Sequence, residues 1–330
     1  MAYTAIDDPE AYFQTKLYTG NADQQAITLD GDTDMQPDLV WIKTRAKTYD
    51  HIINDSVRGV NNTLRPSTTG AESAYTHFSA FGSDGFTLEN HNNVNESGDA
   101  YVAWCWKESA TAGFDIVGYT GNGTDDTDIS HSLSAVPHVI LVKNRDADDP
   151  WRMQHKALGE TYGLILNDTS AKDDDDTAWS DEAPTSSVFT LGTSVNTNRN
   201  TSNFIAYLFS EKQGFSKFGS YLGNGNADGT FVYTGFKPAF VMVKASSSAG
   251  QNWVIHDNKR TTSGGNVINR QLMPNLGNAD DTNDGVDLLS NGFKFRWTGG
   301  DVNYSGRTNI YMAFAEAPFV NSNGVPNNAE

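Results

Sequence analysis

One sequence unit occurs three times in this chain, and this repetition constrains the fold more than any other feature, because repeated units share one architecture. A Tyr-x-Gly-Asn motif begins at Tyr18, Tyr119 and Tyr221, at intervals of 101 and 102 residues. A second motif has a proline, one further residue, four apolar residues and a lysine, and it spans 37–43, 137–143 and 238–244. Both motifs keep the same phase through all three units, which indicates a tandem repeat.

The limits of the units follow from a third common feature. Each unit ends in an aromatic-rich run that closes on a glutamate, at Glu108, Glu211 and Glu316. We therefore predict an N-terminal arm (1–11), three domains (12–110, 114–213 and 214–319) and a C-terminal tail (320–330). Because short linkers hold neighbours in contact, we expect three like units packed side by side about an approximate threefold axis. The terminal arms either fray or dock on a partner subunit.

Composition and periodicity predict an all-β protein. Asn, Thr, Ser, Gly and Asp fill the stretches between apolar runs, which favours turns over long helices. The four apolar residues after each proline are expected of a central strand that is covered on both faces. A strand that begins with Gly-Phe or Val-Phe, at 85, 188 and 292, precedes each closing run. We predict that this strand and the closing run form an antiparallel hairpin with a long tip. The predicted architecture is three tandem antiparallel β-sandwich or jelly-roll-like repeats in a compact body.

Several repeated polar residues have a structural interpretation. We expect Lys43, Lys143 and Lys244 to be solvated strand ends, since each follows the last apolar residue of its run. We interpret His155 and His256 as equivalent residues that make one structural hydrogen bond twice, with Asn54 at that place in the first unit.

The charge balance excludes some partners. Lys and Arg number 23 against 41 Asp and Glu, which gives a net charge of −18, so no broad basic face can neutralise nucleic-acid phosphates. The chain has no apolar run long enough for a membrane span and no signal peptide at its start. The single cysteine, Cys105, is expected to be a packed side chain, and no zinc motif is present.

One acidic cluster is the best candidate metal site. Asp30, Asp32 and Asp34 alternate along the chain, and alternating carboxylates can converge on calcium. The cluster does not complete a calcium-loop pattern, so a solvated loop is the alternative. We predict no cofactor apart from calcium at this cluster.

Four tryptophans are candidate ligand-binding residues. Trp151, Trp179, Trp253 and Trp297 lie in or beside polar loops, where their rings could stack on sugars, or instead plug the open ends of a sandwich. The sequence contains no nucleophile elbow, phosphate-binding loop or dinucleotide motif, and no unit carries a catalytic set that the others lack. We therefore predict no catalytic residues and a protein that is not an enzyme.

These repeats resemble a known module. The segments 12–20, 37–43, 83–87, 101–107, 218–225 and 311–319 are similar to a repeat module in virion proteins of tailed phages, notably those of marine cyanobacteria. The resemblance covers 12–319 and implies a β-rich, lectin-like module used in tail fibres and related surface proteins.

The resemblance implies a phage virion structural protein, a tail-fibre or receptor-binding component at the particle surface. The alternatives are a capsid decoration or cement protein and, third, a glycan-cleaving depolymerase. The expected partners are other tail or capsid subunits, further copies of this chain in a homo-oligomer, and a host surface glycan. Synthesis in the host cytoplasm would precede assembly.

The strand assignment generates a prediction about stability. If the post-proline runs are central strands, Trp41→Ala, Leu141→Ala and Val241→Ala should each lower the free energy of unfolding by about 2–5 kcal/mol, because each leaves a cavity in a core. Urea-induced unfolding measures the change. Unchanged stability in all three variants would contradict the assignment.

Overall fold

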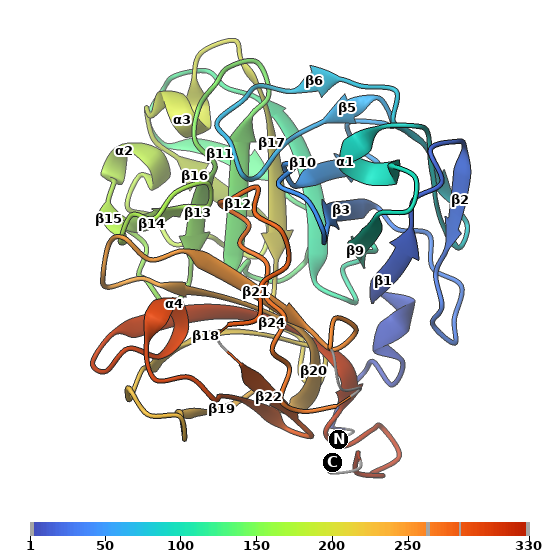
Figure 1. The fold of residues 1–330 in the computed structure, drawn as a ribbon. Coiled ribbons are helices and arrows are strands. Elements are labelled where there is room, and N and C mark those ends of the chain that lie inside the picture. The colour runs from blue at the N-terminus through green and yellow to red at the C-terminus, as the bar shows by residue number, and fades with distance from the viewer. Residues whose placement is uncertain (1–2, 262–264, 284, 328–330) are drawn as a thin grey trace.

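Each repeat folds into two packed sheets, and the post-proline run is an internal strand of the larger, inner sheet. The computed structural model describes residues 3–261, 265–283 and 285–327. Its 41% strand and 6% helix, with antiparallel sheets throughout, confirm the predicted all-β class. Figure 1 shows repeat 1 (12–110) in blue and teal, repeat 2 (114–213) in green and yellow, and repeat 3 (214–319) in orange and red.

The inner sheets share one strand order. In each of them the order is first strand, closing strand, post-proline strand and a fourth strand, and neighbours in this order are hydrogen-bonded. Repeat 1 has β1 (Phe13–Thr19), β9 (Ala100–Trp106), β3 (Leu39–Thr44) and β4 (Ile52–Asp55). Repeat 2 has β10 (Phe114–Thr120), β17 (Asn203–Phe209), β12 (Val139–Asn144) and β13 (Arg152–His155), extended by β14 (Tyr162–Ile165) and β15 (Asp173–Asp174). Repeat 3 has β18 (Ser216–Leu222), β24 (Thr308–Pro318), β20 (Phe236–Ala245) and β21 (Trp253–Asp257).

A smaller outer sheet covers one face of each inner sheet. The outer strands are β2 (Gln25–Thr28), β8 (Gly85–Leu88) and β7 (Phe78–Gly82) in repeat 1, β11 (Thr127–Ser130) and β16 (Val188–Leu191) in repeat 2, and β19 (Phe231–Tyr233), β23 (Gly292–Phe295) and β22 (Val286–Leu289) in repeat 3. The remaining elements are β5 (Asn62–Thr63), β6 (Ser73–Ala74), η1 (Pro9–Ala11), α1 (Asn92–Asn95), α2 (Asp176–Trp179), α3 (Val195–Asn198) and α4 (Gly300–Asn303).

The expected hairpin between the Phe strand and the closing strand is wrong. The Phe strands β8, β16 and β23 belong to outer sheets, whereas the closing strands β9, β17 and β24 belong to inner sheets. The polar stretch between them crosses from one sheet to the other and contains a single-turn helix, α1, α3 or α4. The apolar pattern of the Phe strand and of the closing strand would be the same in a hairpin and in a crossover between sheets. The sequence pattern therefore did not distinguish the two arrangements.

The other faces of the three inner sheets meet in one shared core. Trp106, Phe209 and Phe314 are equivalent by strand register, because each lies opposite the start of its post-proline strand. Their ring centroids are 6.5, 5.7 and 5.7 Å apart pairwise. Three equivalent rings at nearly equal separations place an approximate threefold axis between them.

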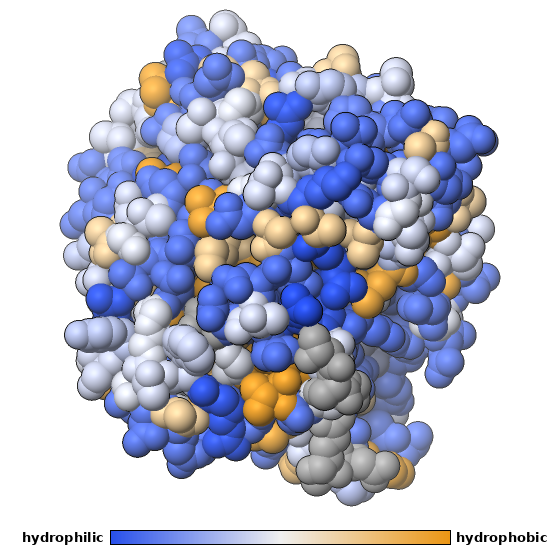
Figure 2. Space-filling model, in the orientation of Figure 1, coloured by the Kyte–Doolittle hydropathy of each residue, from blue (hydrophilic) through white to orange (hydrophobic). Residues whose placement is uncertain are grey.

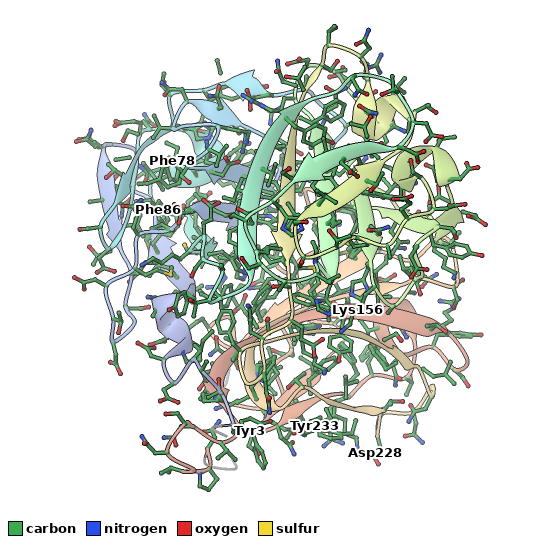
Figure 3. All side chains as sticks on the ribbon, turned by 180° about the vertical axis from the view of Figure 1, so that it is seen from behind. Tyr3, Phe78, Phe86, Lys156, Asp228 and Tyr233 are labelled. Carbon is green, nitrogen blue, oxygen red and sulfur yellow. The ribbon has the colours of Figure 1, made fainter. Side chains whose placement is uncertain are left out.

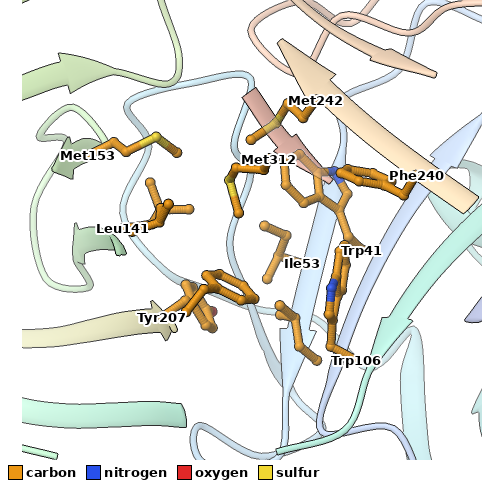
Figure 4. A pocket seen from close by; sticks show the side chains of 12 residues that line it. Trp41, Ile53, Trp106, Leu141, Met153, Tyr207, Phe240, Met242 and Met312 are labelled. Atoms are coloured by element: carbon orange, nitrogen blue, oxygen red, sulfur yellow. The ribbon is translucent and has the colours of Figure 1, made fainter. Parts of the chain in front are cut away.

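An apolar cavity of about 30 Å³ lies within this shared core. Figure 4 shows that its walls come from all three repeats, with Trp41 facing Leu141 across the space and Met242 and Met312 beside them. The lining side chains are hydrophobic, and a cavity without several polar partners does not hold water stably. The cavity is therefore a gap in packing and offers no polar group for chemistry.

The Tyr-x-Gly-Asn motif is structural. The hydroxyl of Tyr18 donates to the carbonyl of Val94 in α1 at 2.7 Å, and the tyrosines of the other repeats donate to α3 and α4 in the same way. A Cβ atom on Gly20 would lie 2.2 Å from the carbonyl oxygen of Glu96. The motif thus holds the crossover helix against the first strand, and glycine is required by the close approach of two backbones.

The N-terminal arm docks within the chain. Thr4 donates to the carbonyl of Gln213 at 2.9 Å, and Ile6 is buried in the shared core. Ser322 of the C-terminal tail donates its backbone N–H to Asp7 at 2.7 Å. Tyr3 also donates to the carbonyl of Gly235 in repeat 3, so both ends lie beside repeat 3 (Figure 1), and the described parts of both arms make contacts within the chain.

Strand register corrects one expected equivalence. His155 lies opposite Val139, whereas His256 lies opposite Val241, one position further along the post-proline strand. His155 is therefore equivalent to Asp55 and Asp257, and His256 is equivalent to Asn54. The sequence comparison missed this one-residue shift because the loop after the post-proline strand is one residue longer in repeat 3 than in repeat 2.

A buried ion-pair network crosses the seam between repeats 1 and 2. The guanidinium of Arg58 donates to Asp55 at 2.5 Å, and both side chains are fully buried. The hydroxyl of Tyr207 in repeat 2 donates to the same carboxylate at 2.6 Å. Glu72 then bridges Arg58 and Arg145 of repeat 2, at 3.0 and 2.8 Å.

The seam between repeats 3 and 1 contains the same network. Arg260 donates to Asp257 at 2.6 Å, again with both side chains fully buried. The indole N–H of Trp104 in repeat 1 donates to Asp257 at 2.9 Å. Asp280 bridges Arg260 and Arg45 of repeat 1, at 2.9 and 3.2 Å.

The third seam, between repeats 2 and 3, lacks this network at the equivalent positions. These positions hold His155, Leu158, Lys172, Ser246 and Met312. The ring of His155 donates from Nε2 to the carbonyl of Tyr311 at 3.1 Å. Two seams thus contain buried Asp–Arg pairs. The third is joined instead by hydrogen bonds, such as that from the backbone N–H of Lys172 to the carbonyl of Ser246, and by the partly exposed ion pair of Lys217 with Glu211.

The networks generate a prediction. Asp257→Asn should lower the free energy of unfolding by about 3 kcal/mol, because it leaves a buried guanidinium short of a carboxylate. The matched control is Asp30→Asn, which breaks a half-exposed ion pair with Lys16 and should change stability by less than about 1 kcal/mol. Urea unfolding measures both, and equal effects would contradict a stabilising role for the buried network.

Candidate functional site

The acidic cluster expected to bind calcium does not converge. Asp30, Asp32 and Asp34 are all exposed, and Asp30 pairs with Lys16 at 3.3 Å. Within the described part of the chain, no three His, Cys, Asp or Glu side chains are placed to hold a metal ion. The structure therefore favours the solvated loop, because the alternating carboxylates lie on an irregular loop that does not fold back around a common centre.

Three of the four candidate sugar-binding tryptophans are buried, which corrects their assignment. Trp151, Trp179 and Trp253 expose at most 1% of their surface. The indole N–H groups of Trp151 and Trp253 donate across seams, to the carbonyls of Arg65 and Ile165 at 3.0 and 2.9 Å. Their rings fill seams and cores, since a large aromatic ring there removes more apolar surface from water than one on a loop. Trp297 remains exposed, at 40%.

The three post-strand lysines are buried, which also corrects an expectation. Lys43, Lys143 and Lys244 have no exposed surface, and each ammonium donates to two backbone carbonyls. Burial lowers the pKa of each to about 8. Backbone carbonyls replace water around each charge. Lys43 and Lys143 fasten the following loop to the strand, whereas Lys244 contacts the carbonyl of Gln251 in its own loop and that of Thr169 in repeat 2.

An exposed aromatic face on repeat 3 is the strongest candidate binding site. Phe231 and Tyr233 of β19 are 45% and 51% exposed, while Val232 between them is buried. Alternate residues of a strand point to one side of the sheet, so the two rings share the outer face of the β19–β23–β22 sheet. The hydroxyl of Tyr3 lies 3.2 Å from that of Tyr233 and donates to the carbonyl of Gly235 at 2.9 Å. Figure 3 shows Tyr3 beside Tyr233 at this end of the molecule.

This face breaks the symmetry of the repeats. Strand register makes Val232 equivalent to Ile27 and Ile129, because each lies opposite the Phe of its neighbouring strand. The outward neighbours are therefore Ala26 and Thr28 in repeat 1, Asp128 and Ser130 in repeat 2, and Phe231 and Tyr233 in repeat 3. Among the described residues, the exposed large aromatic side chains all belong to repeat 3: Phe231, Tyr233, Trp297 and Tyr304.

Ion pairs flank the aromatic rings. Lys294, directly opposite Phe231, contacts the exposed carboxylate of Asp228 at 2.5 Å. Arg296 contacts Asp228 at 2.9 Å and Asp287 at 2.5 Å. Hydrogen bonding to Lys294 lowers the pKa of Asp228, and the hydrogen bond to Asp287 raises that of Arg296. Two cations and two carboxylates therefore give this face no net charge, in a chain whose net charge is −18.

Sequence reasoning singled out Trp297 but missed Phe231 and Tyr233. The signal was present, because aligning the three outer strands residue by residue places two aromatic residues where the other repeats have small or polar ones. The sequence does not indicate that these two side chains are exposed, since the pattern Phe-Val-Tyr is equally typical of a buried strand.

The fold and this face define a class of protein: a three-repeat β body that presents one exposed aromatic face. A family model described as "Domain of unknown function (DUF7483)" matches residues 8–318, so the chain belongs to that family. No curated protein matches the chain.

Among the described helices, none has the length and apolar character to cross a membrane. The face of the molecule in Figure 2 is largely hydrophilic, with separate hydrophobic areas.

Four histidines are buried in the described structure: His51, His77, His155 and His256. Burial lowers the pKa of His155 to about 4 and those of His77 and His256 to about 3. Burial also lowers the pKa of His51. All four are therefore neutral in the folded protein at neutral pH.

These histidines predict acid sensitivity. An unfolded histidine has a pKa near 6.5, so between pH 6.5 and about 4 the unfolded chain binds more protons and the free energy of unfolding falls as pH falls. Each histidine contributes up to about 1.4 kcal/mol per pH unit. Glu108 opposes them with one proton, because burial and Asp115 raise its pKa to about 7. We expect lower stability at pH 5 than at pH 7.5 in urea unfolding, with a shallower slope in His155→Gln. Constant stability over this range would contradict the buried neutral state.

Proposed function

We propose that this protein is a non-enzymatic structural component of a tailed-phage particle, a tail-fibre or receptor-binding protein at the virion surface. The observation that carries the proposal is the symmetry-breaking aromatic face on repeat 3. Exposed aromatic residues that gather on one surface are typical of binding sites, because exposed apolar surface is otherwise costly. The similarity of residues 12–319 to phage virion modules supports the particle as the setting.

The architecture suits this role. The shared core and three seams join the repeats into one body, so the aromatic face is presented on a rigid support rather than on a flexible loop. Repeats 1 and 2 carry small or polar residues at the equivalent outer positions. In this proposal they serve as scaffold and as contacts to other virion subunits, while repeat 3 makes the recognition contact.

Copy number tests the proposal. Quantitative mass spectrometry of purified particles of a phage that encodes this chain should give a small multiple of three or six copies per particle, measured against the major capsid protein. Hundreds of copies would indicate a capsid-coating protein and overturn the tail assignment. Absence from the particle would overturn the virion role.

A further inference from the structure

We infer that the outer face of the β19–β23–β22 sheet binds an uncharged glycan chain, with Phe231 and Tyr233 as the stacking platform. This inference deepens the proposed function and rests on it for the source of the glycan, a host surface. The ligand class follows from the rings, the neutral charge of the face and the exposed hydrogen-bonding groups beside the rings.

The rings are spaced for consecutive contacts. Two residues along a strand separate the ring attachment points by about 7 Å. Gly292, opposite Tyr233, has no side chain, so the ring of Phe231 can lie close to its backbone. A Cβ atom on Gly292 would lie 3.0 Å from that ring. Sugar rings present apolar C–H faces that pack on aromatic rings, while their hydroxyls need polar partners. Tyr233 supplies both an apolar ring and a hydroxyl.

The flanking ion pairs supply the remaining partners. Asp228 is 71% exposed at its side chain, so its carboxylate can accept hydrogen bonds from sugar hydroxyls while it still contacts Lys294 and Arg296. The side chain of Arg296 is 37% exposed, and its guanidinium has further N–H donors. These groups cancel in charge, so they attract neither an anion nor a cation strongly.

The charge of the whole chain argues against other occupants. At −18, two copies repel each other when like faces approach, and an anionic lipid surface or a polyanionic glycan is repelled as well. A neutral, hydroxyl-rich chain carries no such penalty. Charge complementarity therefore favours an uncharged glycan over a second copy, a membrane or an acidic polysaccharide.

Isothermal titration with defined oligosaccharides tests the inference on the full chain. The probes are cellohexaose, maltohexaose and laminarihexaose as neutral chains, and an alginate hexamer as an acidic one. The test variant, F231A/Y233T, places the residues of repeat 1 at the equivalent sites, so it matches a strand that this fold already accepts. The matched control is Val136→Ala, which removes a 46% exposed apolar side chain from repeat 2.

We expect at least one neutral hexaose to bind, F231A/Y233T to weaken that binding at least tenfold with its thermal unfolding retained, and Val136→Ala to leave it unchanged. Binding of none of the three neutral hexaoses, binding of alginate alone, or equal binding by F231A/Y233T would overturn the inference. So would sedimentation showing a wild-type dimer that F231A/Y233T abolishes, since the occupant would then be a second copy. Particle copy number is measured separately, so a failed glycan test and a failed virion assignment are distinguishable.

Discussion

The shared apolar core around Trp106, Phe209 and Phe314 is the interaction on which the rest of the structure depends. Each inner sheet has two apolar faces, and its own outer sheet covers only one of them. The second face can leave water only against the other two repeats, so the three units cannot be independent beads on a string. Burial of the same strand positions in all three repeats imposes the approximate threefold arrangement, and the docked N-terminal arm adds Ile6 to that core.

The three seams show how a repeat protein diverges without losing its architecture. Two seams contain a buried Asp–Arg pair, a bridging carboxylate and an arginine of the next repeat, whereas the third has replaced these groups together. The groups change together because removing one member of a buried ion pair leaves the other charge buried without a partner, whereas replacing the whole pair need not lower stability. The same reasoning explains why the exposed outer faces diverge more freely: no partner there penalises a change. Phe231 and Tyr233 lie on such a face.

Particular residues show how far sequence reasoning reached. The repeat, the all-β class and the central strands followed from motif spacing and from four-residue apolar runs, which report local periodicity. The buried lysines were misassigned because a lysine after a strand looks the same in sequence whether water or loop carbonyls surround its ammonium. Three tryptophans were misassigned because their loops are polar, yet a neighbouring repeat contacts Trp151 and Trp253, and Trp179 lies in the core of its own repeat. Phe231 and Tyr233 were missed because alternation does not reveal which face of an outer strand is solvated.

By itself, the sequence determined the threefold repetition, the antiparallel β class and the acidic charge, since these depend on composition and on spacing along the chain. Only the tertiary structure decided which strands share a sheet, which polar residues form the seams and which aromatic residues face solvent. The physical reason is that burial and pairing depend on contacts between residues about 50–230 positions apart, such as Asp55 with Tyr207 and Tyr3 with Tyr233, and local patterns carry no record of those contacts.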